Sequence, residues 1–141
     1  MKLSRISFLF LLLFLFIPSL AVAQTSRSVT TAANKNWKPF WSKFTSAVKS
    51  KNKAAIKQLM VAEKDFSSGN EDRTRNQWLE NLDKQKQWGE LQKTVAKGTK
   101  PYNSDEKSDW RVTPDNEMLF VLIFEFKNGG WRFLGVMGYS E

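Results

Sequence analysis

The sequence predicts an α+β domain in which N-terminal helices pack against a curved antiparallel β-sheet, preceded by a cleavable signal peptide. Three observations lead to this fold class. The first 23 residues have the order of an export signal, and residues 36–50 carry an aromatic stripe at helical spacing. Residues 117–139 have the pattern of a β-hairpin around Asn128 and Gly129.

Residues 1–23 contain the three parts of a secretory signal peptide. Lys2 and Arg5 precede a run of Phe, Leu and Ile over 6–20, and small residues at Ala21 and Ala23 suit a cleavage enzyme. The apolar run has about 15 residues, fewer than the roughly 20 that a membrane-spanning helix needs. We therefore expect cleavage after Ala23 and a periplasmic or secreted protein. Because no cysteine follows the run, we expect no lipid anchor.

The mature chain is expected to consist of a flexible tether over 24–35 and a single domain over 36–141. Residues 24–35 are rich in Ser, Thr and Ala and have no apolar period. Without residues 1–23 the chain has 118 residues, 20 basic and 14 acidic side chains, and a net charge of +6. This length suffices for one hydrophobic core.

Two residue types are missing from the whole chain, cysteine and histidine. Their absence excludes disulfides, serine–histidine and cysteine–histidine catalysis, and ordinary zinc sites. We expect neither a metal ion nor a cofactor, and we assign no catalytic residue. Stability has to come from burial, for which the mature chain offers six Trp and seven Phe.

The first helix is predicted over 36–50, with Asn36 as its N-cap and Pro39 in its first turn. One face of this helix is apolar at positions i, i+3, i+4, i+7 and i+11: Trp37, Phe40, Trp41, Phe44 and Val48. A second helix is predicted over 52–60 with Asn52 as its cap, and residues 61–73 are expected to form a loop.

A third helix is predicted to begin at a capping box in which Thr74 and Gln77 bond reciprocally. Its inward face consists of Trp78, Leu79 and Leu82. Residues 88–97 match a helix by their apolar spacing, and Gly98 followed by Pro101 suits a helix end. Partial alternation over 90–95 leaves a strand open as the alternative. A polar loop is expected over 102–108.

The C-terminal third predicts a short strand over 109–113, a tight turn over 113–116 and long strands over 117–127 and 130–139. Residues 119–124 are apolar on both faces, which predicts a central strand. A two-residue turn sets four cross-strand pairs: Phe126–Trp131, Glu125–Arg132 as an ion pair, Phe124–Phe133 and Ile123–Leu134. Glycines at 135 and 138 then oppose Leu122 and Leu119, which indicates a curved sheet.

The order of these segments resembles the nuclear transport factor 2-like superfamily. The resemblance is carried by residues 37–44 with Ala47 and Val48, by residues 53–59, and by the closing segment over 129–136. It implies a cone-like α+β domain of the cystatin-like kind with a pocket in the mouth of the cone. In this superfamily the pocket is catalytic in steroid isomerases and dehydratases and purely binding in other members.

The candidate ligand-binding residues are the aromatic side chains expected to face the cone: Trp37, Trp41, Phe44, Trp78, Phe124, Trp131 and Phe133. The leading hypothesis is a non-enzymatic exported domain that holds a small apolar ligand or a protein partner there. An isomerase or dehydratase is the alternative, although no Asp or Tyr matches a catalytic position. The same spacing also fits a simple hydrophobic core.

The positive net charge raises the question of an anionic partner. Export argues against nucleic acid and favours anionic envelope polymers or lipid headgroups. A third hypothesis is therefore a basic protein held at the envelope by its lysines. The lysines also fit an ordinary solvated surface that keeps the protein soluble. A homodimer through the sheet is compatible with the sequence as well.

Overall fold

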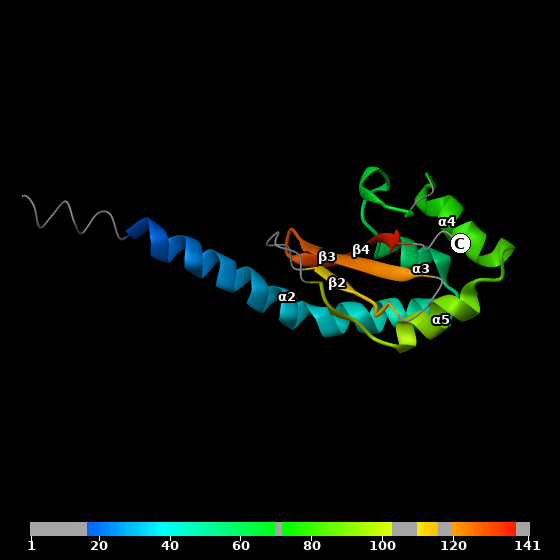
Figure 1. The fold of residues 1–141 in the computed structure, drawn as a ribbon, viewed down its shortest axis with the longest axis horizontal. Helices are drawn as coiled ribbons and strands as arrows, with labels where there is room; N and C mark the ends of the chain where they lie inside the picture. Colours follow the sequence, from blue (N-terminus) through cyan, green and yellow to red (C-terminus); the bar gives the residue numbers. More distant parts are fainter. Residues whose placement is uncertain (1–16, 70–71, 103–109, 116–119, 138–141) are drawn as a thin grey trace, which may run out of the picture. The chain divides into compact units, whose positions relative to one another are not determined.

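The computed structural model describes residues 17–69, 72–102, 110–115 and 120–137. The chain divides into two compact units, Met1–Ala32 and Ala33–Glu141, and the second contains the sheet. Helices α2 (Ile17–Lys49), α3 (Lys53–Gln58), α4 (Arg75–Lys84) and α5 (Trp88–Ala96) and a 3₁₀ turn η1 (Glu63–Asp65) precede the sheet (Figure 1). Within the described ranges, no helix is both long and apolar enough to cross a membrane.

The start of the first helix differs from the prediction. Helix α2 begins at Ile17, so Asn36 lies inside it instead of capping it, and residues 24–35 are helical instead of a flexible tether. The sheet-containing unit starts at Ala33, whose side chain is 2% exposed, and the Trp131 indole N–H donates to the Ala33 carbonyl at 2.8 Å. This hydrogen bond joins residues 98 positions apart in the sequence. It stabilises a helical turn that precedes the predicted start of the helix at Asn36. Pro39, predicted to lie in a first turn, instead lies inside α2, where it has no N–H to donate to the carbonyl four residues earlier.

The three shorter helices, α3, α4 and α5, are present where the sequence predicts them. The Asn52 side chain accepts a hydrogen bond from the Ala55 N–H and caps α3. Thr74 and Gln77 form both bonds of the capping box at the start of α4. Residues 88–96 form helix α5, which excludes the strand alternative, and Gly98 follows it with φ 76°. The inward faces are buried as expected: Trp78, Leu79, Leu82, Trp88, Leu91 and Val95.

The sheet has four antiparallel strands in the order β1 (Lys100–Pro101), β2 (Trp110–Val112), β3 (Val121–Lys127) and β4 (Gly130–Met137). Strand β3 is central, as predicted, and residues 120–124 are buried on both faces. Strand β1 was not expected from the sequence. The predicted turn over 113–116, most of the loop over 102–108 and the Leu119–Gly138 pair lie wholly or partly outside the described residues.

The hairpin register confirms the two-residue turn and corrects the pairing beyond it. Asn128 and Gly129 have φ of 52° and 77°, as the favoured hairpin turn requires. The pairs Phe126–Trp131, Glu125–Arg132 and Phe124–Phe133 are present as predicted. Beyond them a β-bulge shifts the register, so that Ile123 faces Gly135 instead of Leu134 and Leu122 faces Val136.

The bulge has a physical cause on the other side of β4. Residues 59–67, which the sequence assigned to a helix end and a loop, bond along the outer edge of β4: the Phe133 N–H donates to the Leu59 carbonyl at 2.8 Å, and the Val136 N–H donates to the Ser67 carbonyl at 2.9 Å. Leu134, the extra residue, accepts from the Ser67 N–H at 3.1 Å. A Cβ at Gly135 would lie 2.0 Å from the Ser67 carbonyl oxygen, so glycine is required by this close approach.

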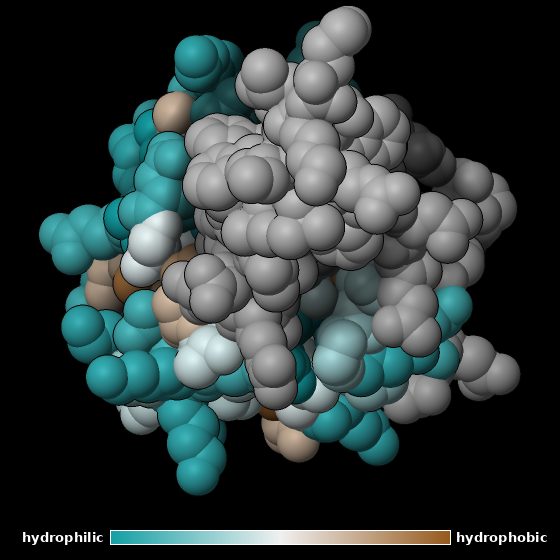
Figure 2. All heavy atoms as spheres, turned by 90° about the vertical axis from the view of Figure 1, so that its left-hand side faces the viewer, coloured by the Kyte–Doolittle hydropathy of each residue, from teal (hydrophilic) through white to brown (hydrophobic). Residues whose placement is uncertain are grey.

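Two apolar clusters lie on the two faces of the sheet. The larger fills the space between the helices and the face that carries Leu122, Phe124 and Phe133. The smaller, on the opposite face, is centred on Val112, Val121 and Ile123. On the face seen in Figure 2 the described surface is mainly hydrophilic, with small hydrophobic patches between polar residues.

We predict opposite effects for two glycine-to-alanine substitutions. Gly135→Ala should lower the free energy of unfolding by about 1–3 kcal/mol, because its Cβ collides with backbone that cannot move aside. Gly89→Ala, at an α5 position with nothing within 4 Å of the added Cβ, should raise it by up to about 1 kcal/mol. Urea denaturation measures both. An unchanged stability of Gly135→Ala would contradict the pairing of β4 with Ser67.

Candidate functional site

The seven aromatic residues predicted from the sequence come together in the larger cluster. Phe124 of β3 is at the centre of the cluster. The centroid of its ring lies 5.6 Å from that of Trp37, 5.5 Å from that of Trp41 and 5.1 Å from that of Phe44. Close ring contacts also join Phe124 to Phe133, Phe133 to Trp78, and Trp37 to Trp131. Most of these pairs are edge-on or tilted, which is the arrangement that aromatic quadrupoles favour.

The rings fill the space in which a ligand was expected. Phe44, Phe124 and Phe133 are each 0% exposed, while Trp37 and Trp41 are half-buried at the rim. Two pockets over the described residues are lined by side chains other than these rings. Three further aromatic residues that were not assigned to the site join the packing: Phe40, Phe66 and Phe120. This packing favours the core interpretation of the aromatic stripe over a ligand pocket.

An arginine closes the rim of the cluster. The Arg111 guanidinium of β2 lies 4.8 Å from the centroid of the Trp37 ring, and its Nε donates to the Thr99 hydroxyl at 3.2 Å. Burial lowers the pKa of Arg111, but a guanidinium stays charged at any physiological pH. The contact is therefore a cation–π clamp between β2 and α2.

The cluster offers no described group for acid–base chemistry. Of the residues that the structure describes, only Thr94 and Thr113 are buried polar side chains. Both are hydrogen-bonded to the backbone, Thr94 as donor to the Glu90 carbonyl and Thr113 as acceptor from the Leu122 N–H. No group of acidic side chains suited to a metal ion occurs in the described ranges.

The expected ion pair between Glu125 and Arg132 is not formed. The two residues oppose each other across β3 and β4, as predicted. Over the part of the chain that the structure describes, however, no ion pair joins them, and the Arg132 guanidinium donates to the Trp131 carbonyl at 2.8 Å.

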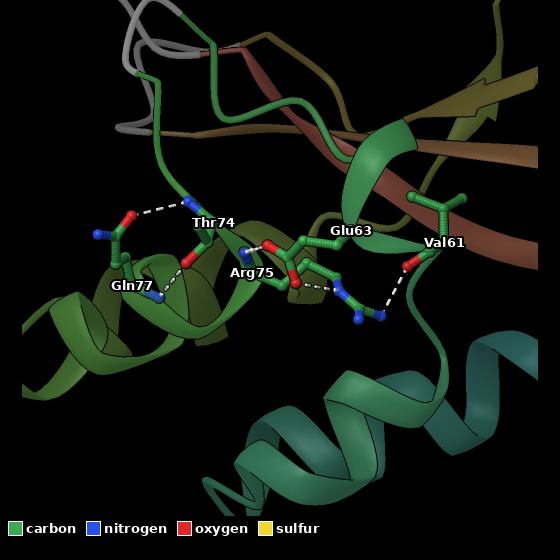
Figure 3. Close-up of polar contacts among 5 residues, drawn as sticks. All are labelled: Val61, Glu63, Thr74, Arg75 and Gln77. Atoms are coloured by element: carbon green, nitrogen blue, oxygen red, sulfur yellow. Dashed lines mark hydrogen bonds and ion pairs between the residues drawn. The ribbon is translucent and has the colours of Figure 1, made fainter.

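Two carboxylates instead connect helices. Figure 3 shows Glu63 of η1 accepting from the Arg75 backbone N–H at 2.6 Å and from the Arg75 guanidinium at 3.0 Å. The same guanidinium donates to the Val61 carbonyl at 2.8 Å. The hydrogen bond from the Arg75 side chain is the main cause that holds the pKa of Glu63 below its ordinary value. These hydrogen bonds connect residues 61–63 to the start of α4.

The second carboxylate, Asp83 at the end of α4, joins three helices. It accepts from the Lys53 ammonium at 2.5 Å and from the Trp88 indole N–H at 2.6 Å. The bond from Lys53 is the main cause that lowers the pKa of Asp83, and the bond from Trp88 is the next. Because Asp83 is exposed, we assign this contact a structural role rather than a catalytic one.

The clearest candidate surface is basic, and its location in the chain was not predicted from the sequence. Residues 33–62 contain seven lysines and no acidic residue, whereas residues 63–141 contain 12 basic and 14 acidic residues, a net charge of −2. The positive charge of the domain is therefore concentrated on α2, α3 and their connections. The seven are Lys35, Lys38, Lys43, Lys49, Lys51, Lys53 and Lys57. The signal in the sequence is the position of the first acidic residue of the chain, which is Glu63.

A groove of about 440 Å³ runs between α2 and α3 on this basic side. Hydroxyl and amide groups line it together with one lysine: Ser42, Lys43, Ser46, Ser50, Asn52 and Gln58. Small and apolar residues form the rest of its lining: Ala47, Ala55 and Leu59. The surface thus combines positive charge with shallow relief, and it has no paired acid and base.

Comparison with known proteins gives no match to a family model, a curated protein or a solved structure. The resemblance to the nuclear transport factor 2-like superfamily consequently stays a prediction from the residues named above, and the function has to be argued from the surface of the domain.

We predict that the contribution of Asp83 to stability disappears in acid. Folding lowers the pKa of Asp83 below its ordinary value of 3.8, so the stabilisation is complete above that pH and is lost as the pH falls through the lower folded-state pKa. Asp83→Asn should be less stable than the wild type at pH 7, and the difference in urea midpoint should shrink progressively as the pH falls below 3.8. Asp65→Asn, at an exposed position on η1, is the control. A difference that stays constant between pH 7 and pH 3 would refute the assignment.

Proposed function

We propose that this chain is an exported, non-enzymatic domain of the nuclear transport factor 2-like type that associates with an anionic lipid surface through its lysines. The observation that carries the proposal is the segregation of charge, with seven lysines and no acidic residue in residues 33–62. An apolar ligand in the cone is not retained as the leading hypothesis, because the rings of Phe44, Phe124 and Phe133 fill that space.

Export is part of the proposal and rests on residues 1–23. The signal directs the mature chain to a compartment bounded by membranes, which provides an anionic surface at high local concentration. Exported protein should have its mature N-terminus at Gln24. Mass spectrometry that finds Met1 at the N-terminus of exported protein would contradict this step.

The alternative of an isomerase or dehydratase has less support. Such an enzyme needs a buried carboxylate or tyrosine with a perturbed pKa inside the cone. Among the described residues, every carboxylate and tyrosine is exposed or half-buried, and the two carboxylates with lowered pKa, Glu63 and Asp83, bind cations on the surface. Neither is placed where a bound substrate would meet the aromatic rings.

A homodimer through the edges of the sheet is not included in the proposal. Strand β1 at one edge has two residues, one of which is Pro101, and proline cannot donate to a further strand. The other edge, on β4, already bonds to residues 59–67. Both edges are therefore poorly suited to pairing with a second copy.

The expected affinity is modest. A lysine close to an anionic bilayer contributes about 1 kcal/mol, so four lysines in contact give about 4 kcal/mol, which corresponds to a dissociation constant of roughly 1 mM. Screening by salt weakens it further, since the Debye length falls from about 10 Å at 0.1 M to about 3 Å at 1 M. The association is therefore reversible and controlled by ionic strength.

Co-sedimentation of the mature chain with lipid vesicles tests the proposal. We expect binding to vesicles that contain phosphatidylglycerol, little binding to pure phosphatidylcholine, and release in 0.5 M salt. The triple variant Lys43→Gln, Lys49→Gln and Lys51→Gln, all exposed positions within residues 33–62, should bind at least tenfold more weakly than the wild type.

The matched control has the same net charge but changes exposed lysines outside residues 33–62: Lys97→Gln, Lys100→Gln and Lys127→Gln. It should lose much less binding. Equal loss in both triple variants would show that only the net charge matters. Equal binding to neutral vesicles, or binding that salt does not weaken, would reject the electrostatic association.

A further inference from the structure

Helices α2 and α4 end with the same backbone motif. At the end of α2 the Lys51 N–H donates to the Val48 carbonyl at 3.1 Å, and the Asn52 N–H donates to the Ala47 carbonyl at 2.9 Å. This pair of bonds defines a Schellman cap with Lys51 at the position just beyond the helix.

At the end of α4 the Lys86 N–H donates to the Asp83 carbonyl at 3.1 Å, and the Gln87 N–H donates to the Leu82 carbonyl at 2.9 Å. Lys86 therefore occupies the same position in the second cap that Lys51 occupies in the first.

Both lysines have left-handed backbone conformations, with φ of 53° at Lys51 and 54° at Lys86. Glycine adopts this conformation without strain, whereas a Cβ makes it unfavourable for other residues. The chain itself uses glycine after α5, where Gly98 has φ 76°. The third residue other than glycine with positive φ in the described ranges is Asn128, a type that tolerates it. Two lysines thus stand where glycine would be more stable.

Local electrostatics does not explain why lysine is at these two positions. A cation near the C-terminus of a helix interacts favourably with the helix dipole. Lys49 and Lys84 already provide that cation in the last turns of α2 and α4, in unstrained helical backbone. The left-handed backbone at Lys51 and Lys86 therefore motivates the search for a role outside the helices.

The two caps lie at the same end of the domain. Asp83 of α4 bonds to the Lys53 ammonium from the start of α3, and the nearby charge of Lys51 also contributes to the lowered pKa of Asp83. The Gln92 amide of α5 donates to the Val48 and Lys49 carbonyls at the end of α2. Figure 1 accordingly shows α3, α4 and α5 gathered at one end of the sheet. We call this surface the helical corner and define it by residues 49–53 and 84–87.

The helical corner is cationic, and all of its charged residues are lysines. It presents Lys49, Lys51, Lys53, Lys84 and Lys86, and the carboxylates beside it are Glu80 and Asp83, which pair with Lys84 and Lys53. Over the described residues, the exposed side chains of Lys49, Lys51 and Lys86 have no ion pair. Arginine would suit bidentate recognition of one phosphate, whereas lysines act as point charges toward many. A diffuse layer of anionic headgroups fits this set better than a single bound anion.

We propose that the helical corner is the part of the domain that contacts an anionic bilayer, and that Lys51 and Lys86 keep their left-handed positions because their ammonium groups reach the headgroup phosphates. This inference rests on the proposed function and specifies which of the lysines contact the lipid. It also implies that lysine at these two positions lowers the stability of the free domain, since glycine there would relieve backbone strain.

The double variant Lys51→Gly and Lys86→Gly tests both halves of the inference. Its melting temperature should rise by about 3–8 °C, because glycine relieves the left-handed strain at two sites. Its partition onto vesicles of phosphatidylglycerol in phosphatidylcholine should fall by roughly tenfold or more, because two contacting charges are lost. Lys51→Arg with Lys86→Arg keeps the charges and the strain and should bind like the wild type. The exposed pair Lys97→Gln and Lys100→Gln is the control with the same net charge as the glycine variant.

The possible outcomes separate the inference from the proposed function. If the wild type does not bind anionic vesicles, the proposed function fails. If the wild type binds and the glycine variant binds equally well, the function stands and the inference is wrong. A melting temperature that falls in the glycine variant overturns the strain argument. Binding to soluble polyphosphate without binding to vesicles overturns the choice of a bilayer as the partner.

Discussion

The contact between the aromatic stripe of α2 and the ring of Phe124 is the interaction on which the rest of the structure depends. Four rings from α2 lie 5.1–5.8 Å from it, those of Trp37, Phe40, Trp41 and Phe44. Without disulfides, burial of such large apolar surfaces has to offset the conformational entropy of folding. Phe124 belongs to the central strand β3, so these ring contacts join α2 directly to the middle of the sheet.

The same packing bears on the proposed function. The rings of Phe44, Phe124 and Phe133 are fully buried, so the proposed lipid contact is placed on the surface, where charge is unevenly distributed. Residues 33–62 carry all of the positive excess, while the remainder of the domain is slightly acidic. One helix therefore serves two purposes, with its aromatic face in the core and its lysine face in water. The helical corner, where α2 gives way to α3 and α4 to α5, combines this charge with two strained backbone positions.

Signals that depend on neighbouring residues were readable in the sequence. The capping box at Thr74, the cap at Asn52 and the turn at Asn128 each involve groups within a few residues, so their chemistry fixes the local conformation. Features that depend on distant partners were not readable. The start of the domain at Ala33 depends on Trp131, and the bulge at Leu134 depends on Ser67. The seven aromatic site residues do pack together, as their spacing predicted, but only the structure shows that Phe44, Phe124 and Phe133 are fully buried among one another.

The central claim is that the aromatic cluster is a filled core, and the response of Phe124→Ala to a small apolar probe tests it most directly. The account predicts that benzene leaves the melting temperature of the wild type unchanged. Removing the Phe124 ring should cost about 3–5 kcal/mol of unfolding free energy and open an apolar cavity, so benzene should raise the melting temperature of the variant. If benzene stabilises the wild type as strongly as the variant, or if the substitution costs less than about 1 kcal/mol, a pocket already exists among these rings and the account is contradicted.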